Sequence, residues 1–126
     1  MSGVLAIVAT ARLATPAATE FLRVLAALRA LDRAVELVET GEAVGAFAGE
    51  PDLTPDGERY LEALAEDGVV PHAAPDLAAR IEAAADVIVL ANPARAGTPP
   101  LVRWDDVRGR PDAVARALDA GLFVRR

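Results

Sequence analysis

The sequence predicts an α/β fold with a mostly parallel sheet of four to five strands, and three observations support this. Residues 4–10, VLAIVAT, form a continuous apolar run, as expected of a strand buried on both faces. A periodic helix follows almost at once, and the order of strand and then helix recurs along the chain. A length of 126 residues with 53% hydrophobic content fits a single domain. We therefore expect residues 4–10 to form the first and central strand.

The first helix and the second strand are expected directly after this run. Thr15 can cap the helix, and Pro16 suits its first turn, where no amide hydrogen is needed. The helix is predicted over residues 16–31, because apolar side chains recur on one face at Phe21, Leu25 and Leu28. Residues 34–40 predict a strand, and a helix between two short strands implies a right-handed parallel crossover.

Two further helices are expected in the middle of the chain. Residues 42–48 predict a short helix. Thr54, followed by proline, repeats the helix-start signal seen at Thr15, and the next helix is predicted over residues 55–67. Gly68 suits the left-handed position at its end.

The second half of the chain continues this alternation. A strand over residues 69–73 is expected to be short, irregular or at an edge, because Pro71 cannot donate to a ladder. Residues 76–85 then predict a helix, and residues 87–90 predict a buried strand. The C-terminal extension, residues 92–126, is expected to contain a long loop (92–103), a last helix (111–120) and a terminal strand (122–124).

Charge and composition exclude several classes of function. The net charge of -6 leaves no broad positive surface for non-specific binding to nucleic acid or to an anionic membrane. All 13 basic residues are arginine, which removes Schiff-base chemistry and lysine-dependent phosphate loops. The absence of cysteine excludes thiol nucleophiles, persulfide carriage and thiolate metal sites. With only one histidine, no metal site is expected, and no cofactor is predicted.

The sequence also predicts a cytoplasmic location. Its N-terminus lacks the positively charged lead of a signal peptide, and no apolar run approaches the roughly 18 residues of a spanning helix.

The apolar blocks and turns of residues 4–90 follow a recognisable series: a buried first strand, LRALDRAVELVE, TGEAV, LEALAEDGV and IEAAADVIVL. This series resembles the DsrE-like proteins of the sulfur-relay class. The resemblance implies a three-layer α/β/α fold of flavodoxin-like or Rossmann-like type, with a tendency to form homo-oligomers. Active members are expected to carry a persulfide on a cysteine near the exit of the strand after the LEALAEDG helix. This chain reads VVPHAAPD there, so that activity does not carry over.

Candidate binding residues are expected at the carboxyl ends of the strands, because open α/β sheets bind ligands in the crevice there. They are Thr10, Arg12, Glu42, His72, Asn92 and Arg95. Arg12 and Arg95 near helix N-termini could hold a phosphate or carboxylate, since guanidinium groups and free backbone amides favour an anion. The alternative is that both are solvated loop arginines.

His72 is the candidate for proton transfer. Its ordinary titration range suits a general base, and Glu42 is the expected orienting carboxylate. The alternative is a structural or exposed histidine without a catalytic role.

Two functions of different class follow from these observations. The first is a non-catalytic DsrE-like binding or assembly module that forms a homo-oligomer and does not itself carry sulfur; the missing cysteine favours it. The second is a small enzyme, or a nucleotide-binding or anion-binding protein, that uses the crevice at the strand carboxyl ends. Neither involves nucleic acid or a membrane, and a small anionic ligand is the expected small-molecule partner.

Overall fold

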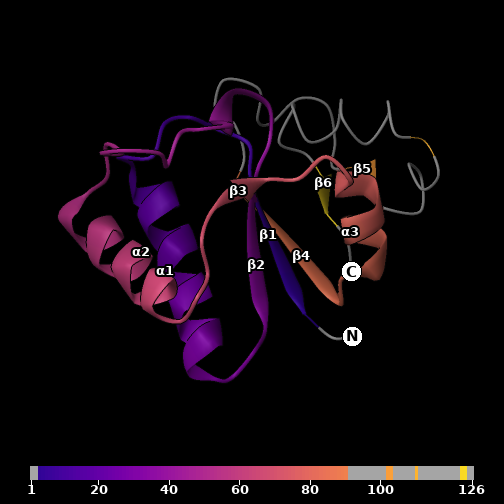
Figure 1. Ribbon diagram of the computed structural model, residues 1–126, viewed down its shortest axis with the longest axis horizontal. Helices are drawn as coiled ribbons and strands as arrows, with labels where there is room; N and C mark the ends of the chain where they lie inside the picture. Colours follow the sequence, from indigo (N-terminus) through magenta and orange to yellow (C-terminus); the bar gives the residue numbers. More distant parts are fainter. Residues whose placement is uncertain (1–2, 91–101, 104–109, 111–122, 125–126) are drawn as a thin grey trace.

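The computed structural model describes residues 3–90, 102–103, 110 and 123–124, and within them the main sheet has four parallel strands (Figure 1). Their spatial order is β3, β2, β1, β4. The strands are β1 (Val4–Val8), β2 (Val35–Glu39), β3 (His72–Ala73) and β4 (Asp86–Leu90). The predicted α/β fold with a parallel sheet is therefore confirmed, and β1 lies inside the sheet between β2 and β4.

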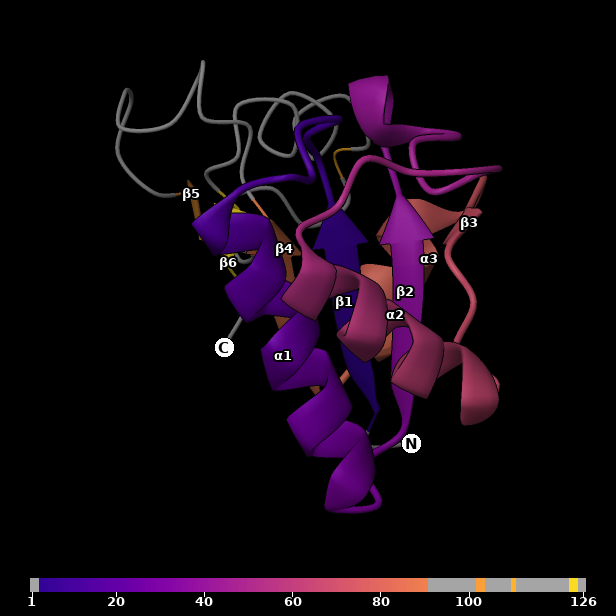
Figure 2. The same cartoon turned by 90° about the vertical axis from the view of Figure 1, so that its left-hand side faces the viewer.

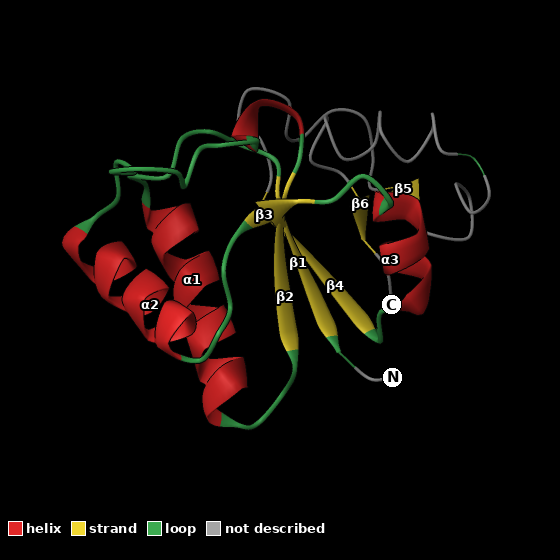
Figure 3. Ribbon diagram, in the orientation of Figure 1, coloured by secondary structure: helices red, strands yellow, loops and turns green. Residues whose placement is uncertain are grey.

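Helices lie on both faces of this sheet and make three layers (Figure 3). The neighbouring helices α1 (Pro16–Ala30) and α2 (Pro55–Glu66) cover one face, and α3 (Leu77–Ala83) lies on the other (Figures 1 and 2). The strand order matches the first four strands of a Rossmann-like sheet. The strand order reverses between β1 and β4, and sheets of this order typically bind ligands outside the carboxyl ends of the strands at such a reversal.

The side chains of β1 alternate between the two faces, as the pleat of a strand requires. Ala6 and Val8 belong to the apolar cluster beneath α1 and α2, whereas Leu5 and Ile7 belong to the cluster beneath α3. All four are at most 2% exposed. A strand buried on both sides has no solvent face, which explains the unbroken apolar run.

The helices α1 and α2 begin with the same threonine cap. Thr15 Oγ1 accepts the Ala18 amide at 3.1 Å, and Thr54 Oγ1 accepts the Gly57 amide at 3.0 Å. The two helix starts are also joined, since Thr19 Oγ1 lies 2.6 Å from Thr54 Oγ1. A Cβ at Gly57 would lie 3.1 Å from Thr54 Oγ1. Glycine therefore leaves room for this junction.

The short helix expected over residues 42–48 is reduced to a single 3₁₀ turn, η1 (Gly41–Ala43). Gly45 follows with φ of 83°, a left-handed conformation that ends helical geometry. The amides of Gly45 and Phe47 donate hydrogen bonds to the carboxylate of Glu39. A buried side-chain acceptor thus replaces the carbonyls that a helix would have supplied.

The strand expected over residues 69–73 is confirmed as a short edge strand, but it starts later than expected. The Val69 amide bonds to Leu64 O at 2.9 Å, and the Gly68 amide bonds to Ala65 O at 3.0 Å. These bonds keep the chain wrapped around the end of α2, so pairing with β2 begins only at His72.

A second small sheet lies beyond the main one, formed by β5 (Val102–Arg103) and β6 (Phe123–Val124) in parallel. The terminal strand expected over residues 122–124 is thus present as β6, which contacts β4. The loop expected over residues 92–103 ends in β5 and lies otherwise outside the described residues, as does the helix expected over 111–120. Among the helices that the structure describes, none has the length and apolarity needed to cross a bilayer.

Candidate functional site

The loops after β1 and β2 are tied together by polar side chains. The Ala11 amide donates to Glu42 Oε2 at 3.0 Å, so the Glu42 carboxylate bridges the two loops. Thr10 is 2% exposed, and its Oγ1 accepts the Arg12 amide at 3.1 Å. The predicted residues Thr10, Arg12 and Glu42 are therefore brought together at the strand ends, where backbone hydrogen bonds occupy Thr10 and Glu42.

Glu39 is a further carboxylate at this edge that the sequence analysis missed. It is the last residue of β2 and is 8% exposed. Its Oε1 accepts the Gly45 amide at 3.2 Å, and its Oε2 accepts the Phe47 amide at 3.3 Å. The available signal was an acidic residue closing an apolar strand just before a glycine-containing turn, where buried amides need an acceptor.

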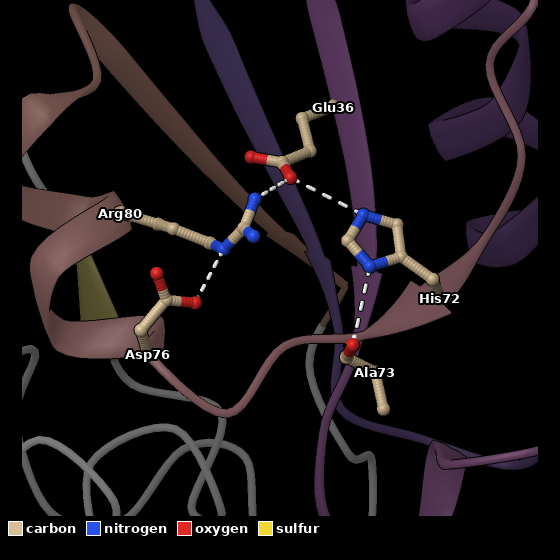
Figure 4. Close-up of polar contacts among 5 residues, drawn as sticks. All are labelled: Glu36, His72, Ala73, Asp76 and Arg80. Carbon is tan, nitrogen blue, oxygen red and sulfur yellow. Dashed lines mark hydrogen bonds and ion pairs between the residues drawn. The ribbon is translucent and has the colours of Figure 1, made fainter.

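His72 lies on β3 and contacts a different carboxylate from the one predicted. Glu36 Oε2 on β2 lies 3.2 Å from His72 Nε2, while Ala73 O lies 3.1 Å from His72 Nδ1 (Figure 4). Glu36 therefore takes the place expected for Glu42, because His72 pairs with Val38 and so lies on the same face of the sheet as Glu36. Both ring nitrogens face acceptors, so both contacts are hydrogen bonds at once only in the imidazolium form.

Arg80 of α3 completes this group. It forms an ion pair with Glu36, and its Nε donates to Asp76 Oδ1 at 2.7 Å. Figure 4 shows Arg80 and His72 approaching the same carboxylate oxygen from opposite sides. We refer to Glu36, His72, Asp76 and Arg80 as the Glu36 cluster.

The sequence analysis missed the Glu36 cluster because Glu36 lies 36 residues before His72 and 44 residues before Arg80 in the chain. Two signals were present: Glu36 interrupts the apolar run of β2, and Asp76 and Arg80 have the i, i+4 spacing of a helical ion pair. Neither signal identifies the partner strand or helix.

A cavity of about 310 Å³ adjoins the Glu36 cluster. Apart from Glu36 and Arg80, its lining is apolar or small: Gly3, Val4, Leu5, Ala34, Val35, Ala83 and Ala84. These residues come from the amino ends of β1 and β2 and from the end of α3. The cavity therefore lies at the opposite end of the strands from the crevice that the sequence predicted.

The Arg12 side chain is exposed, and the predicted residues Asn92 and Arg95 lie outside the described residues. Within the described ranges, no group of three or more His, Asp or Glu residues is placed to hold a metal ion. Comparison of the chain with family models, with curated proteins and with solved structures finds no match.

Proposed function

We propose that this chain is a non-catalytic binding or assembly module of DsrE-like type that does not itself carry sulfur. The observation that carries the proposal is the use made of the carboxylates at the strand ends. Glu39 and Glu42 both accept backbone amides, which fixes the loops of the crevice instead of presenting an acid or base to a substrate.

The chemistry of the side chains supports the proposal that the chain does not itself carry sulfur. Sulfur relay needs a thiolate to attack the donor and a sulfur atom to hold the product, and the chain has no cysteine. His72 is the one histidine, and its carboxylate partner is shared with Arg80. A base whose orienting carboxylate is already in an ion pair is poorly suited to proton transfer.

A homo-oligomer is part of the same proposal. The apolar fraction of 53% is high for a chain of this size, and Val44 and Val70 are 55% and 61% exposed. In addition, β3 pairs with only two residues of the five in β2, which leaves part of a strand edge without ladder bonds from β3. Exposed apolar side chains and an open edge both favour contact with a second copy.

The test is to purify the protein and weigh it before and after incubation with a sulfur donor and a desulfurase. Native mass spectrometry is expected to report a defined oligomer of the 13.1 kDa chain and no added sulfur. A reductant-sensitive gain of one sulfur mass would refute the proposal, and a strict monomer at micromolar concentration would refute the oligomer.

The strand order supports an anion site as the second candidate function. Thr10 and Arg12 follow β1 closely, next to the reversal between β1 and β4, and Rossmann-like sheets typically bind ligands outside the carboxyl ends of the strands at such a reversal. Phosphate, sulfate or a mononucleotide at millimolar concentration should then raise the melting temperature, and Arg12→Ala should abolish the rise. An unchanged melting temperature would remove this candidate.

A further inference from the structure

The cavity beside the Glu36 cluster has the size and lining of a small-ligand site. Its volume of about 310 Å³ lies at the lower end of the range found for small-molecule pockets. Leu5, which points to the face of α3, supplies an apolar wall together with Ala84, and Gly3, Ala34 and Ala83 leave the space open because their side chains are small or absent. Such a lining favours an apolar ligand body of modest size.

The polar part of the lining has unused hydrogen-bonding capacity. Glu36 uses Oε2 for both Arg80 and His72, and Oε1 has no partner among the described residues. The Glu36 side chain is 36% exposed, so a ligand can reach this oxygen. An ionised carboxylate oxygen accepts most strongly from a charged donor.

The charges around the cavity favour a cation. With His72 counted as neutral, Glu36 and Asp76 bring two negative charges against the single positive charge of Arg80, and on the same count the whole chain carries -6. A ligand carboxylate at Arg80 would lie beside both acidic side chains and be repelled. An ammonium group at Glu36 Oε1 instead neutralises the excess negative charge.

We propose that this cavity binds a small apolar molecule that carries one ammonium group. The ammonium group donates to Glu36 Oε1, and the apolar body lies against Leu5 and Ala84. The proposal gives a ligand class to the binding module proposed above and rests on that function. The proposed site lies at the amino ends of β1 and β2, whereas the anion crevice is predicted at the carboxyl ends of the strands.

The test compares three probes of the same shape at pH 7: benzylamine, benzyl alcohol and benzoate. Calorimetry is expected to show the tightest binding for benzylamine and the weakest for benzoate. Amide chemical shifts are expected to change at Val4, Val35 and Ala84, which locates the probe. Glu36→Gln should weaken benzylamine binding by about tenfold or more, because a charge-assisted hydrogen bond becomes a neutral one.

Two further variants keep this test decisive. Ala83→Leu fills the cavity while keeping the Glu36 cluster, so it should abolish binding of benzylamine and benzyl alcohol alike. Glu62→Gln, on the exposed surface of α2, is the matched control and should leave binding unchanged. Each variant is first compared with the parent protein by its amide spectrum, to establish that it is folded.

Several outcomes would overturn the proposal. They are equal affinity for the three probes, benzylamine binding unaffected by Glu36→Gln or by Ala83→Leu, shifts confined to other residues, or no benzylamine binding at millimolar concentration. These outcomes are distinguishable from failure of the proposed function, because oligomer formation and sulfur loading are measured on the protein without any probe.

Discussion

The two faces of the main sheet differ in both coverage and chemistry. On one face, α1 with 15 residues and α2 with 12 residues bury a large apolar cluster that includes Leu22, Leu25 and Leu64. On the other face, α3 has 7 residues and packs over a smaller cluster around Ile81. The Glu36 cluster and the cavity both lie on this second face.

The contrast shows how one strand can serve two purposes. In β2, Leu37 points into the large cluster, whereas Glu36 and Val38 point toward the face of α3. Packing against α1 and α2 can hold the sheet together, and the thinner cover on the second face leaves space for a ligand. We therefore expect stability to depend mainly on the first face.

The largest effect is expected from a matched pair of leucine truncations. Leu25 on α1 is fully buried, and Leu25→Ala should cost about 2–5 kcal/mol of unfolding free energy through lost burial and a new cavity. Leu77 on α3 is half-buried, so Leu77→Ala should cost only about 1 kcal/mol. Urea unfolding measures both, with the exposed Leu31→Ala as the control. Equal losses at Leu25 and Leu77 would contradict the proposed difference between the faces.

A second prediction compares two carboxylates of β2 that point to opposite faces. Glu39→Gln should cost about 1–3 kcal/mol, because a buried acceptor of two amides loses its charge and turns a donor toward one of them. Glu36→Gln should cost less, since that side chain is 36% exposed and water compensates. The free energies come from the same urea unfolding, with the exposed Glu66→Gln as the control. A larger loss at Glu36 would show that the second face contributes more stability than its cover suggests.

Removing a helix cap should lower stability by less than the substitutions above, and the caps of α2 and α3 again compare the two faces of the sheet. Thr54→Ala removes a cap at the start of α2 and should cost about 1 kcal/mol. Asp76 stands at the corresponding position of α3 but makes no capping hydrogen bond, and its exposed ion pair with Arg80 is weak. Asp76→Ala should therefore lower stability by less than Thr54→Ala. Thermal unfolding of the two variants checks the order, and a reversed order would be evidence against it.

The smallest effect is expected at the exposed Glu20–Arg23 pair on α1. The hydrogen bond from Arg23 lowers the pKa of Glu20 below its ordinary value. The associated stability is present above the unfolded-state pKa and is lost as the pH falls through the lowered one. At pH 7, Arg23→Gln should leave the melting temperature unchanged within error, since solvent screens the pair. NMR titration should show the pKa of Glu20 rising in the variant, and a clear fall in melting temperature would contradict the prediction.

Much of the fold was predictable because its signals are local. The unbroken apolar run of β1 and the Thr-Pro starts of α1 and α2 each act over a few residues, and the structure confirms all of them. The short helix after β2 was mispredicted because its outcome depends on Glu39, whose burial is a property of the folded sheet.

The candidate site was less predictable, because its contacts join segments that meet only in the folded sheet. The meeting of the loops after β1 and β2, which Ala11 and Glu42 join, follows from the pairing of these two parallel strands. The predicted partner of His72, Glu42, was wrong, because the choice between Glu36 and Glu42 depends on the register in which β3 pairs with β2. The cavity depends on small residues in segments that meet only after folding, and no local pattern marks it.

The junction between Thr19 and Thr54 also fixes the direction in which protons are donated. Thr19 has one hydroxyl proton and gives it to Thr15 O at 2.9 Å, so across the 2.6 Å contact it must accept from Thr54. Thr54 can donate because the hydrogen bond from the Gly57 amide uses a lone pair of its oxygen and leaves its hydroxyl proton available. The result is a chain of three hydrogen bonds that all donate in the same direction, from the Gly57 amide of α2 to the carbonyl of Thr15, the cap of α1. Unfolding the first turn of either helix breaks this chain of hydrogen bonds, so the first turns of the two helices should exchange their amide hydrogens together.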